Sequence, residues 1–138
     1  MQTAIRREIP KPASEILAYH HDRLLDRYSM DYGVSLEESQ RCFNALKEFL
    51  IVCAVMPGYK VTSDQIDGMW HTFLLFTKDY KTFCEDNLGM FINHEPFEHA
   101  APEAYLKTRA FAQEYFGHLD EELWSVEAKA DCSSGCGE

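Results

Sequence analysis

The sequence has 138 residues, of which 46% are hydrophobic and 13% aromatic. This composition excludes a mainly disordered chain, and the length suits one domain with one hydrophobic core. The net charge of −10 argues against a protein that binds nucleic acid, because such binding needs a basic face.

The N-terminal part of the chain predicts an irregular arm and two helices. Prolines break regular structure in residues 1–12, and a first helix should follow and end at Gly33, which suits a left-handed terminus. Ser35–Glu38 forms a capping box that opens the second helix, and Pro57 follows its end. The span from Leu46 to Met56 is apolar on nearly every side after Lys47 and Glu48, which predicts a central helix covered by others.

A second capping box, Thr62–Gln65, opens a third helix that is expected over residues 64–86. Gly89 lies beyond its end. The residues that follow are too apolar for a free loop, so we expect a short buried irregular segment, or a short extended piece, around residues 89–96.

Pro102 suits the first turn of a last helix. Residues 127–138 are small and polar and are expected to form a flexible Cys/Gly/Ser tail. Residues 13–126 would then form a single helical domain. The predicted fold class is all-α, an irregular bundle of four to five helices.

The third helix carries the most informative pair of side chains. Asp67 and His71 are one turn apart and share a face. At this spacing both can ligate one metal ion, or the carboxylate can orient a histidine that acts as a base. The same pair can also stabilise the helix by a few tenths of a kcal/mol without any other role. Gly68, between them, costs the helix about 1 kcal/mol relative to alanine and is expected to allow another helix to approach closely.

A third ligand could come from the segment after the helix. If residues 89–96 return across the helix, His94 would complete a zinc or iron site of Asp67, His71 and His94 with an open position for water or substrate. This arrangement is a hypothesis, because spacing along the chain does not determine the distance between the two segments.

The remaining candidate ligands are the following: Cys84, His99, Cys132 and Cys136. Cys84 is expected to be a small core residue and is also an additional candidate ligand. Cys132 and Cys136 could handle metal, form a redox pair or be modified, or they could have no role.

The stretch from Val61 to Pro96 resembles the glycine-rich domain-containing protein-like family, and the chain would be a short, bacterial-type member. The matching motif residues are Asp67, Trp70, His71, Tyr80, Cys84 and His94. The resemblance implies a helical domain but no particular reaction. The family often has two adjacent histidines where this chain has Asn93 and His94, so a ligand could be missing here.

The number and placement of the cysteines bear on location. The chain has five, and they are too scattered for a secreted disulfide framework. No apolar stretch follows the basic residues near the start, and the longest apolar run, Phe49–Met56, is too short to span a membrane. We therefore expect a cytoplasmic protein with no membrane association.

Three functions stay open, since the sequence has no HExxH, paired CxxC or glycine-rich phosphate loop. The first is a small metal-binding protein that could be a metal-dependent enzyme. The second is a non-catalytic interaction domain: residues 82–138 contain 12 acidic and 3 basic residues, which would favour a basic protein or peptide partner. The third is a scaffold that presents the C-terminal cysteine tail.

Overall fold

The computed structural model describes residues 6–58, 60–96, 102–126 and 134–136. Within these residues the fold is all-α, as predicted, and residues 6–12 are irregular. The helices are α1 (Ala13–Leu17), α2 (Asp22–Tyr32), α3 (Leu36–Val55), α4 (Asp64–Leu74), α5 (Thr77–Phe83), the π-helical turn η1 (Cys84–Leu88) and α6 (Pro102–Phe116). Three very short strands are β1 (Lys60–Val61), β2 (Glu95–Pro96) and β3 (Ser134–Cys136).

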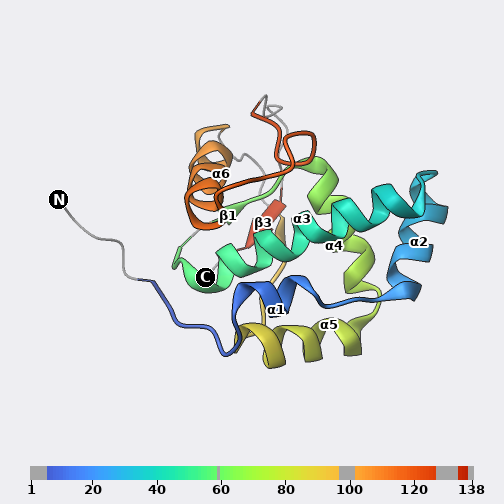
Figure 1. Ribbon diagram of the computed structural model, residues 1–138, viewed down its shortest axis with the longest axis horizontal. Helices are drawn as coiled ribbons and strands as arrows, with labels where there is room; N and C mark the ends of the chain where they lie inside the picture. Colours follow the sequence, from blue (N-terminus) through green and yellow to red (C-terminus); the bar gives the residue numbers. More distant parts are fainter. Residues whose placement is uncertain (1–5, 59, 97–101, 127–133, 137–138) are drawn as a thin grey trace.

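Helix α3 runs through the middle of the molecule, with α1, α2, α4 and α6 packed around it (Figure 1). Its start is capped as predicted, because the Ser35 hydroxyl accepts a hydrogen bond from the Glu38 amide at 3.0 Å. Every residue from Phe49 to Val55 is buried, so this half of the helix has no solvent face. No described helix is both long enough and apolar enough to cross a membrane.

Lys47 is a charged residue inside this core. Its ammonium group donates hydrogen bonds to the carbonyl oxygens of Leu17 and Tyr19, both at 2.7 Å, and lies 4.5 Å from the centre of the Phe43 ring. Burial lowers the pKa of Lys47 to about 8. Sequence analysis placed the covered part of this helix only after Lys47, whereas the side chain in fact holds the chain where α1 ends.

The single first helix expected before Gly33 is instead two helices. The chain leaves helical geometry after Leu17 and re-enters it at Asp22. His21 caps the second helix, because its Nδ1 atom accepts a hydrogen bond from the Leu24 amide at 3.1 Å. The carbonyls that a continuous helix would use internally are free to bind Lys47.

The continuous third helix expected over residues 64–86 is also wrong. The backbone turns at Phe76 (φ −95°, ψ 65°), which separates α4 from α5. The turn brings Tyr80 of α5 back against Phe73 of α4, with ring centres 5.1 Å apart. The π-helical turn then ends at Gly89, which has the left-handed φ of 74°. The apolar periodicity correctly predicted that this stretch is helical, but it did not predict the turn at Phe76 between α4 and α5.

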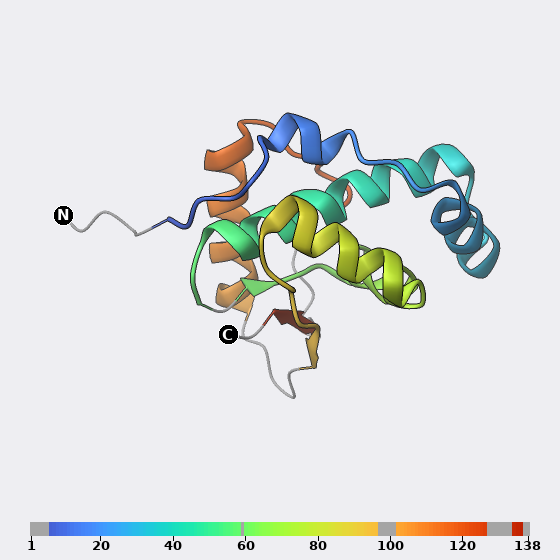
Figure 2. The same cartoon turned by 90° about the horizontal axis from the view of Figure 1, so that it is seen from below.

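Part of the expected flexible tail is a strand. Strand β3 lies between β1 and β2 and is antiparallel to both, with Cys136 opposite Lys60 and Gly135 opposite Glu95. Figure 2 shows this arrangement, with β3 in dark red between β1 in green and β2 in gold. Residues 127–133 and 137–138 of that prediction lie outside the described residues. The C-terminal strand is therefore hydrogen-bonded to the segment that follows His94.

The role of Lys47 can be tested with Lys47→Met, which keeps an apolar stem and removes the ammonium group. We expect the free energy of unfolding to fall by about 2 kcal/mol, because two carbonyls lose their charged donor. Urea denaturation followed by circular dichroism measures this. Lys81→Met, at an exposed position on α5, is the control and should change stability by less than about 0.5 kcal/mol. Equal effects of the two substitutions would contradict the assignment.

Candidate metal centre

Asp67, His71 and His94 form one cluster, in which one potential ligand atom from each residue lies within 4.8 Å of the others. The Oδ1 atom of Asp67 is 2.8 Å from Nε2 of His94, and Oδ2 is 3.6 Å from Nε2 of His71. The two imidazole rings lie side by side with centres 4.6 Å apart. The structure thus brings together the three residues that the sequence singled out.

The start of helix α4 determines where Asp67 and His71 point. The helix is capped by Ser63, whose hydroxyl accepts a hydrogen bond from the Ile66 amide at 3.4 Å; the sequence analysis had begun the capping box one residue earlier, at Thr62. The Ser63 hydroxyl also donates to the Leu123 carbonyl at 2.8 Å, which ties the cap to the core. The Asp67 carboxylate therefore lies near the positive end of the helix, where the helix dipole favours negative charge.

A buried chain of hydrogen bonds brings His94 to this helix. The indole Nε1 of Trp70 donates to the Tyr80 hydroxyl at 3.0 Å, and that hydroxyl donates to the Ile92 carbonyl at 2.5 Å. Residues 89–96 are consequently fastened across α4. The expectation of a buried segment is wrong for most of them, because Ile92 is the one buried residue among 89–95 and residues 95–96 form strand β2. The His94 ring packs edge-on against Trp70, with ring centres 4.4 Å apart.

The three side chains differ in their access to solvent. Asp67 and His94 are 18% and 12% exposed, whereas His71 is 53% exposed. The first two are held in place by packing, and the third can turn. A ligand would thus approach from the His71 side.

Tyr32, at the end of α2, lies beside the cluster. A Cβ atom added at Gly68 would come within 3.0 Å of the Tyr32 hydroxyl oxygen, so glycine is needed for this approach. The predicted close helix approach at Gly68 is confirmed. Burial, and then the charge of Asp67, raise the pKa of Tyr32. From the sequence, Tyr32 was expected only at the end of a helix. The one sequence feature that indicated a close neighbour for α4 at this point was Gly68.

Cys84 and Cys136, the other candidate ligands that the structure describes, do not join the cluster. Cys84 is fully buried close to the Ile92 backbone and the Tyr80 side chain, in agreement with its expected core role. Burial raises the pKa of its thiol. Cys136 is buried in β3, where it lies opposite Lys60 in the strand register. His99 and Cys132 lie outside the described residues.

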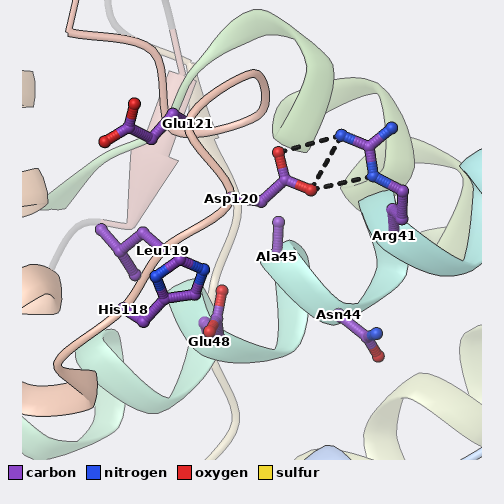
Figure 3. A pocket seen from close by; sticks show the side chains of 8 residues that line it. All are labelled: Arg41, Asn44, Ala45, Glu48, His118, Leu119, Asp120 and Glu121. Atoms are coloured by element: carbon purple, nitrogen blue, oxygen red, sulfur yellow. Dashed lines mark hydrogen bonds and ion pairs between the residues drawn. The ribbon is translucent and has the colours of Figure 1, made fainter.

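A separate cavity of about 580 Å³ lies between α3 and the segment after α6 (Figure 3). The Arg41 guanidinium forms two hydrogen bonds with the Asp120 carboxylate, at 2.9 and 3.0 Å, on one side of this cavity. Glu48 and the exposed His118 line another side. Glu48 accepts a hydrogen bond from the Trp124 indole at 3.1 Å, and burial raises the pKa of its carboxyl to about 7.

Comparison with known families gave one match, over residues 15–121, to the model described as UCP032817-like. The match covers most of the chain and includes the whole cluster. The chain belongs to the UCP032817-like family. Comparison with curated proteins and with solved structures gave no match.

The resemblance to the glycine-rich domain-containing protein-like family is therefore wrong. That resemblance depended on six residues between Val61 and Pro96, three of which, Trp70, Tyr80 and Cys84, are buried side chains that also serve packing here. The UCP032817-like match extends through α2, α3 and α6 as well. A short motif on a packed helix could not separate the two families.

The hydrogen-bond chain through Tyr80 predicts the effect of Tyr80→Phe. Removing the hydroxyl leaves the Trp70 indole and the Ile92 carbonyl without a partner in the core, so the free energy of unfolding should fall by about 2 kcal/mol. Hydrogen exchange should also become faster in the segment that carries His94. Tyr115→Phe is the control, because the described contacts of Tyr115 are made by its ring. Unchanged exchange in residues 91–94 would contradict the proposed role of this chain.

The environment of Glu48 predicts a pH dependence of stability. A carboxyl whose pKa is about 7 in the folded state and 4.5 in the unfolded chain binds a proton on folding between these pH values. The stabilisation of the folded state by this bound proton is fully present below pH 4.5 and is lost as pH rises through 7. Relative to Glu48→Gln, the wild type should lose on the order of 2 kcal/mol between pH 5 and pH 8. Urea titrations across this range measure it, and the exposed change Glu103→Gln should leave the wild-type slope in place.

Proposed function

We propose that this chain is a small metal-binding protein that holds zinc or ferrous iron through Asp67, His71 and His94. The observation that supports the proposal is the position of the Asp67 carboxylate, whose two oxygens face imidazole nitrogens from two separate segments. Two histidines and one carboxylate are a ligand set that zinc and non-haem iron enzymes use. The local excess of negative charge in residues 82–138 also favours a cation.

The three side chains would have distinct roles in such a centre. Asp67 and His94 are held by packing and form the rigid part of the site, while His71 closes it from the solvent side. Three protein ligands leave room for a water molecule or a substrate. A bound metal would supply Lewis-acid chemistry at that position. The Tyr32 hydroxyl, which donates a hydrogen bond to the Gly68 carbonyl at 3.5 Å, would lie beside Asp67 at the edge of such a centre. We propose this metal-dependent enzymatic role together with the metal binding itself.

Another reading of the same geometry is structural. The Asp67–His94 hydrogen bond joins the return segment to α4 and would help hold it without any metal. This reading gives His71 no essential role, because that side chain is half exposed and its nitrogen is 3.6 Å from the carboxylate. His71 is thus the residue that separates the two readings.

Calorimetric titration of metal-free protein with zinc chloride, and anaerobically with ferrous iron, tests the proposal. Wild type should bind one equivalent, and His71→Ala should bind at least ten-fold more weakly without loss of stability, because His71 is exposed. His118→Ala, another exposed histidine, is the matched control and should bind as the wild type does. Equal binding by wild type and His71→Ala would refute the proposal.

A further inference from the structure

Two buried thiols from distant parts of the chain meet in the core. Cys53 lies in the C-terminal half of α3 and is 1% exposed, and Cys136 lies in β3 and is 3% exposed. The thiol of Cys136 is close enough to raise the pKa of Cys53, and neither residue forms a disulfide in this structure. The function proposed above uses neither of them.

The architecture of the short strands explains why these two residues meet. The Lys60 ammonium group donates hydrogen bonds to the carbonyls of Met56, Pro57 and Gly58, at 2.6, 3.0 and 2.7 Å. Strand β1 is therefore held against the end of α3. Cys136 is directly opposite Lys60 in the antiparallel pairing, so the strand register places Cys136 beside α3. The backbone pairing therefore determines the position of Cys136 relative to the end of α3, the helix that carries Cys53.

We propose that Cys53 and Cys136 form a reversible disulfide that links strand β3 to helix α3. The oxidant is a small-molecule disulfide such as oxidised glutathione. The Cys136 thiolate attacks one sulfur of that disulfide, which forms a mixed disulfide and releases one thiol. The Cys53 thiolate then attacks the Cys136 sulfur and releases the second thiol. The two protein thiols lose two protons and two electrons, and the small disulfide gains both.

The order of the two steps follows from the surroundings of each thiol. Cys53 is fully enclosed, and burial, together with the neighbouring Cys136 and Cys84, raises the pKa of its thiol. Its thiolate is scarce, so it is poorly suited to attack first. Strand β3 has three residues, and its local opening costs less than global unfolding. Cys136 is therefore the residue that reaches the oxidant, and the rate should rise with pH.

The bond would act on the candidate metal centre through β2. Gly135 pairs with Glu95, the residue directly after His94, so fastening β3 also restrains the segment that carries His94. This consequence depends on the proposed function, whereas the disulfide itself does not.

The test treats the full chain at pH 8 with oxidised glutathione, followed by intact-mass measurement and peptide mapping without reduction. The wild type should lose the mass of two hydrogen atoms and yield a peptide that joins Cys53 to Cys136. Cys53→Ala should lose this product, and Cys42→Ala, a matched substitution of a buried free cysteine on the same helix, should keep it. A bond from Cys136 to Cys132 or to Cys84, or a stable glutathione adduct on Cys136, would overturn the proposal.

Thermal unfolding is a second readout, because a bridge that closes such a long loop restricts the unfolded chain. Oxidation should raise the melting temperature of wild type and Cys42→Ala by roughly 5–15 °C and leave Cys53→Ala unchanged. His71→Ala should still form the disulfide, and reduced Cys53→Ala should still bind zinc. Failure of the disulfide and failure of the metal centre are therefore distinguishable. A bridge that forms but does not raise the melting temperature would overturn the claim that it links β3 to α3.

Discussion

The complete burial of the C-terminal half of helix α3 is the constraint on which the rest of the structure depends. A helix with no solvent face must be covered on all sides, and the neighbouring helices are arranged to do this. Polar groups inside this core need partners, and Lys47 and Lys60 supply them to backbone carbonyls at the end of α1 and at the end of α3. Buried ammonium groups thus determine where the chain changes direction.

The candidate metal centre lies where this core meets solvent. Helix α4 buries Trp70 against α3, and the adjoining, more exposed face of the same helix carries Asp67 and His71. The Trp70 indole donates its N–H to the Tyr80 hydroxyl. That hydroxyl in turn donates to the Ile92 carbonyl and so holds residues 89–96 in place. One aromatic side chain therefore links the core to His94. Because the chain of hydrogen bonds is buried, it positions His94 firmly, while the exposed His71 stays free to adjust.

Much of the fold could be predicted because helix signals are local. The Ser35 cap, the apolar run after Leu46 and the start of α6 at Pro102 depend on residues within one or two turns. The corners at His21 and Phe76 could not be predicted, because each depends on a partner more than a turn away or on packing. Strand β3 was missed for the same reason, since three small residues form a strand only when two others flank them.

The sequence by itself determined the helical class, the central helix, and the face that Asp67 and His71 share, because a period of 3.6 residues fixes which side chains lie together on one helix. The tertiary structure alone decided that His94 joins them, that Tyr32 lies over Gly68, and that Cys136 meets Cys53. These contacts join residues that are 27 or more positions apart along the chain. Their distances depend on how whole elements pack around α3, and spacing along the chain carries no information about that.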